Sequence, residues 1–175
     1  MARLPYLDPP GEIADRIRER RGGTLRPLDR VLLHSPAMAE GWNGLLGAVR
    51  RRSSLPDDVR ELVILRVAAL NGAAYEWDAH APIARAAGLG EHELDYLREP
   101  GGPSPLTSEQ QVAFDFTTAL TRTCRVDDAL FASARGAFGE QGVVDLAVAV
   151  GAYNMVSRFL TALDVGETLD EEKSA

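Results

Sequence analysis

Helix start and stop signals recur along this chain, and they constrain its fold more than any other feature. Asp8 and the two prolines after it start a helix over about residues 11–20, which Gly22 ends. Similar signals and an apolar periodicity of three to four residues predict seven more helices, over about residues 36–49, 57–71, 75–87, 91–98, 106–123, 127–139 and 143–164. No segment reads convincingly as a strand. We therefore expect an all-α bundle of seven or eight helices.

Two of these helices carry especially clear local signals. Thr107 and Gln110 have the spacing of a capping box, which starts the helix that ends near Thr123. The helix that begins at Pro36 carries an apolar stripe that we expect to face a core, formed by Met38, Trp42, Leu45, Leu46 and Val49.

The length of 175 residues suits a single domain over residues 1–175. Within it we expect an N-terminal helical extension at residues 1–25 and an acidic tail at 167–175. Residues 99–105 read E-P-G-G-P-S-P and form the one conspicuous linker. Seven residues of this kind need not separate two folding units.

Composition excludes several classes of function. The net charge of −7, from 26 acidic and 19 basic residues, argues against a nucleic-acid partner. No uninterrupted apolar run approaches the roughly 18 residues of a membrane span, and the N-terminus lacks the apolar region of a secretory signal. Cys124 is the only cysteine, so neither an internal disulfide nor a thiolate metal cluster is possible. We expect a cytoplasmic protein that acts on a small molecule.

Candidate catalytic groups lie in the segment that reads E-L-V-I-L-R-V-A-A-L-N-G-A-A-Y-E-W-D-A-H, from Glu61 to His80. Glu76 and His80 are four residues apart, so they share a helix face. A break at residues 71–72 would fold this helix back against the preceding one and bring Glu61 within reach. A carboxylate beside an imidazole fixes its tautomer, and two carboxylates in one site favour the protonated form of one of them. Such a group can supply an acid and a base at neutral pH.

The spacing of Glu61, Ala73, Glu76 and His80 resembles the motif E-x11-C-x2-C-x3-H of the carboxymuconolactone decarboxylase family and its alkylhydroperoxidase D-like branch. The resemblance extends from L-D-R-V-L-L-H-S-P-A-M, near Leu28, to the final G-A-Y-N-M-V-S-R-F-L-T-A-L-D-V. It implies an alkylhydroperoxidase D-like fold and homo-oligomers, either trimers or hexamers. Both cysteines of the redox branch are absent, whereas the decarboxylase branch works without cysteines, metal or organic cofactor.

We therefore expect a cofactor-independent lyase (decarboxylase) or isomerase that acts on a small carboxylated or lactone-type substrate by proton transfer. His80 would be the principal acid or base, Glu61 would orient it and tune its charge, and Glu76 would be the second proton donor or acceptor. Substrate contacts are expected from Tyr75, Trp77, Tyr153 and Asn154. No metal is expected, although Glu61, Glu76 and His80 form a conceivable ligand set.

Structural interpretations of the same residues stay open. Glu61 could be a solvated acid or the partner of an arginine on another helix, and Glu76 with His80 could be a surface pair. The aromatic residues beside the motif could serve helix packing, and Tyr153 and Asn154 could bond the core or a protomer contact. Cys124 at a helix end is expected to fill the core, although a peroxidase that uses it is a third option. A noncatalytic ligand-binding or assembly protein on a scaffold without the two cysteines is the main alternative. The roles of His34 and residues 50–52 stay open.

Overall fold

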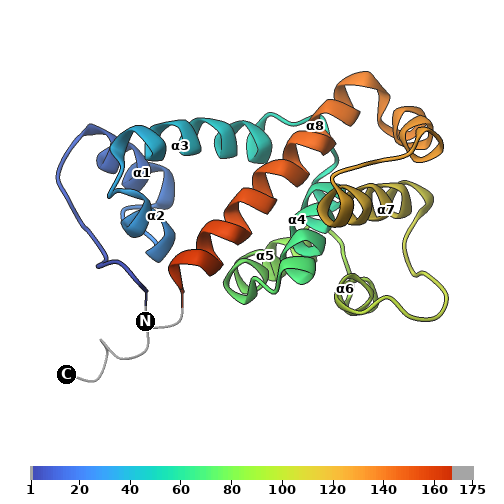
Figure 1. The fold of residues 1–175 in the computed structure, drawn as a ribbon, viewed down its shortest axis with the longest axis horizontal. Coiled ribbons are helices and arrows are strands. Elements are labelled where there is room, and N and C mark those ends of the chain that lie inside the picture. Colours follow the sequence, from blue (N-terminus) through green and yellow to red (C-terminus); the bar gives the residue numbers. More distant parts are fainter. Residues whose placement is uncertain (1, 167–175) are drawn as a thin grey trace. The chain divides into compact units, whose positions relative to one another are not determined.

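A computed structural model describes residues 2–166 of the chain (Figure 1). These residues form helices and no strands, which confirms the predicted all-α class. The helices are α1 Glu12–Arg21, α2 Pro27–Leu32, α3 Pro36–Arg51, α4 Asp57–Asn71, α5 Ala74–Ala86, α6 Glu91–Arg98, α7 Ser108–Thr123 and α8 Asp128–Leu163. The acidic tail predicted at 167–175 lies outside the described residues.

Contacts between residues divide the chain into two compact units. One contains residues 2–48 and 159–166 of the described part, and the other is Val49–Arg158. The predicted linker at 99–105 lies inside the second unit and separates no folding units there. The single domain over residues 1–175 stays a prediction.

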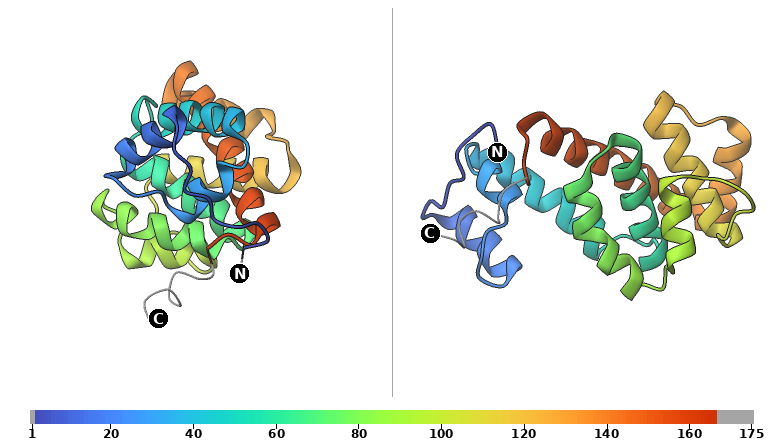
Figure 2. Two further views of the ribbon diagram at one scale, coloured as in Figure 1. Left: turned by 90° about the vertical axis from the view of Figure 1, so that its left-hand side faces the viewer. Right: turned by 90° about the horizontal axis from the view of Figure 1, so that it is seen from below.

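Helix α4 is the centre of the second unit, and α5, α6 and α7 pack against it (Figures 1 and 2). Every residue from Glu61 to Ala68 is buried, so α4 is enclosed on all its faces. Gly72 ends the helix in the left-handed conformation, with φ 65° and ψ 28°, which glycine adopts without steric cost. The Ala73 N–H then donates to the Ala68 carbonyl at 2.9 Å, and α5 folds back against α4 as the sequence predicted.

The last two helices predicted from the sequence form one element, α8, which has a break. Gly139 has φ 70° and ψ −179° inside α8, close to the predicted end of the helix over 127–139. Asp127 caps α8, because its Oδ1 accepts a hydrogen bond from the Leu130 N–H at 2.8 Å. By length and composition α8 could cross a membrane, but a single helix of this kind is weak evidence for a span, and half of its most apolar stretch is buried in the protein.

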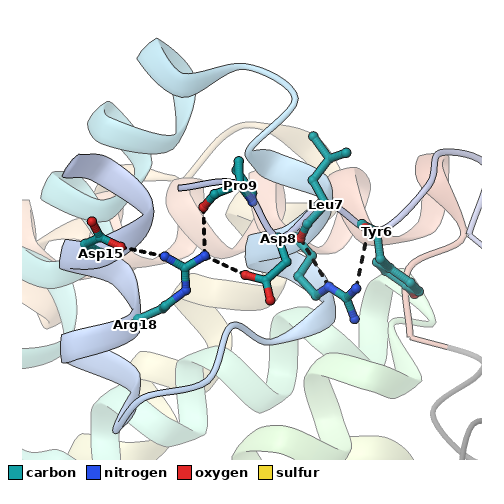
Figure 3. Close-up of polar contacts among 7 residues, drawn as sticks. Tyr6, Leu7, Asp8, Pro9, Asp15 and Arg18 are labelled. Atoms are coloured by element: carbon teal, nitrogen blue, oxygen red, sulfur yellow. Dashed lines mark hydrogen bonds and ion pairs between the residues drawn. The ribbon is translucent and has the colours of Figure 1, made fainter. Parts of the chain in front are cut away.

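In the first unit, two arginines bind the segment that precedes α1. Arg18 donates to Asp8 Oδ1 at 2.5 Å, to the Pro9 carbonyl at 2.7 Å and to Asp15 Oδ1 at 2.6 Å (Figure 3). Arg30 donates to the Leu7 carbonyl at 3.2 Å and to the Tyr6 carbonyl at 3.3 Å. Figure 3 shows Tyr6 and Leu7 near Arg18. Within the predicted extension at 1–25, the helical residues are therefore those of α1, Glu12–Arg21, and side chains hold the non-helical residues before it.

Two packing expectations were wrong. Of the stripe predicted on α3, Leu46 and Val49 are buried and Trp42 packs partly buried against a core cluster, but Met38 and Leu45 are 63% and 40% exposed. Cys124 is exposed and fills no core. It ends α7 in the left-handed conformation, with φ 56° and ψ 21°.

Candidate active site

Glu61 and His80 form a buried pair between α4 and α5. His80 Nδ1 lies 2.8 Å from Glu61 Oε2, and the two residues are 8% and 2% exposed. A carboxylate only accepts hydrogen bonds, so Nδ1 carries the hydrogen and the lone pair of a neutral imidazole is on Nε2. Arg60 Nε lies 3.4 Å from the other Glu61 oxygen, which adds a positive charge beside the carboxylate. The geometry is that of an oriented general base.

Glu76 lies on the same side of α5 as His80, one helical turn before it, and is 2% exposed. Its Oε2 accepts a hydrogen bond from the Ser157 hydroxyl of α8 at 2.5 Å. Its Oε1 is buried, and no hydrogen-bond partner for it lies among the described residues. Burial raises the pKa of Glu76 from 4.5 to about 8, against the opposing effects of the Ser157 hydrogen bond and the Arg50 charge. Glu76 is therefore largely a neutral acid at pH 7.

Tyr153 of α8 completes the cluster. Its ring meets the His80 ring edge to face, with centroids 5.4 Å apart, and its hydroxyl accepts a hydrogen bond from Arg50 Nε at 2.8 Å. Burial raises the pKa of Tyr153 to about 12, although Arg50 opposes the rise. The phenol stays neutral, and its ring covers one side of the imidazole.

Of the other residues expected to contact substrate, Asn154 and Trp77 have partners outside this cluster. Asn154 binds α4 and α7 to α8, because its amide contacts Asn71 at 3.1 Å and Thr121 at 3.0 Å. Tyr75 is half-buried in the first turn of α5. Trp77 is buried, and the Arg98 guanidinium stacks 4.1 Å from the centre of its ring. Asn154 thus has the core-bonding role that the sequence analysis left open.

An open hollow of about 440 Å³ lies over the start of α5. Ala73, Trp77 and Arg98 are among the residues that line it, together with Asp78 and Glu99. Ala73, Trp77 and His80 follow one another at spacings of four and three residues, so the hollow and the buried cluster lie along one face of α5. Glu61, Glu76 and His80 are not among the lining residues. The hollow is of a size that holds small molecules.

Two interpretations from the sequence are excluded by this geometry. Glu61 is not a solvated acid, and Glu76 with His80 is not a surface pair, since all three are buried. The hydrogen bond of Glu76 goes to Ser157, whereas that of His80 goes to Glu61. The hairpin of α4 and α5 nevertheless brings Glu61 to His80, as predicted from the sequence, and Tyr153 interacts electrostatically with both Glu61 and Glu76.

Ser157 was not predicted from the sequence as part of the site, and Arg50 was given no role. Ser157 follows Tyr153 by four residues on the buried face of α8, and Arg50 follows Leu46 by four residues on the buried face of α3. A polar residue that continues an apolar face was the available signal in both cases. For a metal there is no comparable arrangement, because no three His, Cys, Asp or Glu side chains of residues 2–166 are placed to hold one.

Comparison of sequences gives two findings. Residues 36–119 match the sequence pattern of the carboxymuconolactone decarboxylase family. The chain is also 28% identical over 115 residues to the uncharacterized protein YdfG of Bacillus subtilis (strain 168), an alignment that covers 65% of this chain and 78% of YdfG. The match of residues 36–119 includes the whole segment from Glu61 to His80.

Comparison of structures extends the likeness to nearly the whole chain. An uncharacterized peroxidase-related protein from Ralstonia eutropha JMP134, described as an alkylhydroperoxidase AhpD core, superposes with a TM-score of 0.83 at 20% identity, over 97% of this chain and 93% of that one. The debrominase Bmp8, in a variant in complex with 2,3,4-tribromopyrrole, superposes with a TM-score of 0.73 at 16% identity, over 90% and 85%. At these identities the likeness concerns the fold, which is alkylhydroperoxidase D-like.

Proposed function

Because residues 36–119 match the sequence pattern of the carboxymuconolactone decarboxylase family, and because alanine and glutamate stand where that family's redox branch has its thiols, we propose that the chain is a member of this family and an enzyme that moves protons. Its substrate would be a small carboxylated or lactone-type molecule, and the reaction a decarboxylation or an isomerisation without thiol peroxidase chemistry. The observation that carries this proposal is the buried Glu61–His80 pair beside the neutral carboxyl of Glu76.

The cluster contains one group that would accept a proton, His80, and one that would donate a proton, Glu76. In an isomerisation, His80 Nε2 would take a proton from one atom of the substrate while Glu76 gives a proton to another. In a decarboxylation, the electrons of the broken bond to the leaving CO₂ stay on carbon, and that carbon would take a proton from Glu76 or from protonated His80. Glu61 accepts the hydrogen bond of Nδ1 throughout and stabilises the imidazolium when it forms. The hollow over Ala73 and Trp77 would admit the substrate.

A panel of small lactones and carboxylates, including carboxymuconolactone, tests the proposal. Candidates are first ranked by the rise they cause in melting temperature, and then followed in heavy water by proton NMR and by CO₂ release. We expect turnover by the natural sequence and by His92→Ala, a change at an exposed histidine outside the cluster. His80→Asn should lose turnover, because asparagine can still donate to Glu61 but has no basic nitrogen. Turnover that survives His80→Asn would refute the assignment.

A noncatalytic ligand-binding protein is the second candidate, and one observation favours it. The hollow is lined by Ala73, Trp77 and Arg98, whereas the acid and base groups lie outside its lining. Such a protein would bind a compound of the panel saturably and leave it chemically unchanged. In that case Trp77→Phe would weaken binding while His80→Asn would leave it intact.

A further inference from the structure

The position of Ser157 bears on which oxygen of Glu76 carries the acidic proton. The hydroxyl of Ser157 donates to Glu76 Oε2 at 2.5 Å, and both side chains are almost fully buried. An oxygen that accepts a hydrogen bond is the carbonyl-like oxygen of a carboxylic acid, so the proton is favoured on the other oxygen. That other oxygen, Oε1, is the one with no hydrogen-bond partner among the described residues.

From this arrangement we propose that Ser157 is a positioning residue, which fixes the proton of Glu76 on Oε1 and thereby presents it to an acceptor oxygen of a bound carbonyl, lactone or carboxylate compound. A buried polar group without a partner costs roughly 1 to 3 kcal/mol, so its presence in a folded protein calls for a specific explanation. A ligand that accepts this hydrogen bond explains it. The inference rests on the proposed proton-transfer function, whose acid it orients.

The other charged and titratable groups near Glu76 do not replace Ser157 in this role. Arg50 of α3 acts on Glu76 through its charge, while its Nε donates to the Tyr153 hydroxyl. Glu61 of α4 bonds to His80 of α5. Ser157 is therefore the group of α8 whose hydrogen bond distinguishes the two oxygens of Glu76.

Infrared spectroscopy tests this role without any substrate. The difference spectrum between the natural sequence and Glu76→Gln isolates the C=O stretch of the protonated Glu76, and a pH series gives its titration midpoint. We expect the band at pH 7 and its loss near pH 8. For Ser157→Ala, the difference spectrum is taken against the double variant that carries Ser157→Ala and Glu76→Gln. The C=O band of Glu76 should then move to higher frequency, because Oε2 loses the hydrogen bond from Ser157. The midpoint should also rise, since the Ser157 hydrogen bond lowers the pKa of Glu76.

Ser133→Ala is the matched control, because it removes an exposed hydroxyl from α8 that donates to the Ala129 carbonyl within the helix, at 3.0 Å. Ser157→Cys supplies a weaker donor and should shift the band and the midpoint in the same direction by less. It also keeps the test decisive if Ser157→Ala does not fold. The proposal is overturned if Glu76 shows no protonated band at pH 7, or if the Ser157 variants titrate as Ser133→Ala does.

These measurements separate the inference from the proposed function. A compound panel without turnover would remove the enzymatic proposal and leave the infrared result for Ser157 and Glu76 as it stands. If the Ser157 variants leave the Glu76 band and midpoint unchanged while turnover is found, the proposed role of Ser157 is wrong and the proposed proton-transfer reaction still stands.

Discussion

Glu76→Gln is expected to stabilise the protein at neutral and alkaline pH, although it removes a proposed catalytic acid. Glutamine has nearly the shape of a protonated glutamate and stays neutral. Burial raises the pKa of Glu76 from 4.5 to about 8, so between these values the folded chain binds one more proton at this site than the unfolded chain. The free energy of unfolding therefore falls as pH rises through this window. The contribution is fully present below pH 4.5 and lost once pH passes about 8.

The size of the effect follows from the same values. At about 1.4 kcal/mol per pKa unit, the rise from 4.5 to about 8 corresponds to about 5 kcal/mol. The difference in unfolding free energy between Glu76→Gln and the natural sequence should be under about 1 kcal/mol at pH 5. It should reach about 3 kcal/mol at pH 7 and about 5 kcal/mol above pH 8, in favour of the variant.

Urea denaturation at several values between about pH 5 and pH 9 measures this difference. Glu109→Gln is the matched control, because Glu109 is an exposed acid in the first turn of α7. Titrations at other sites cancel between the variants, so only the Glu76 contribution remains. If the difference in unfolding free energy between Glu76→Gln and the natural sequence is the same at every pH in this range, the raised pKa of Glu76 is refuted.

Three further outcomes are expected. Glu61→Gln should lower any activity found with the panel by about 10² to 10⁴, because it leaves His80 without its charged partner, and rates equal to those of Glu109→Gln would contradict this. Consumption of hydroperoxide with a dithiol donor should match a control without protein, and robust consumption abolished by Cys124→Ser would restore the peroxidase option. Light scattering at micromolar concentration should show a homo-oligomer, either a trimer or a hexamer, and a monomer would refute that expectation.

Most helix boundaries could be predicted because the signals that set them are local. The capping box of Thr107 and Gln110 has both of its hydrogen bonds, and Gly72 ends α4 where the sequence placed the break. Helix α2 was missed because its six residues are too few to show a periodicity. Its signal was Pro27 in the first turn, and an isolated proline also starts turns and extended chain.

The site was predictable in part for the same reason. Glu61 and His80 are 19 residues apart, and a single helical hairpin brings them together, so spacing and one glycine were enough. Ser157 and Glu76 are 81 residues apart, and Arg50 and Tyr153 are 103 apart. Periodicity shows which face of a helix is buried, but the partner across that face depends on the packing of several helices. The contact partners of Ser157 and Arg50 therefore could not be derived from sequence.

The burial at position 76 gives a physical reason why a carboxyl suits this scaffold for acid chemistry. The environment of Glu76 disfavours a charged side chain and raises its pKa to about 8. The same desolvation would raise the pKa of a thiol and lower the fraction of reactive thiolate, which a redox site must offset by other means. For a carboxyl the effect is directly useful, because an acid that stays protonated at neutral pH can give its proton away. His80 keeps its hydrogen bond to Glu61 beside this acid, so one buried cluster contains both a donor and an acceptor of protons.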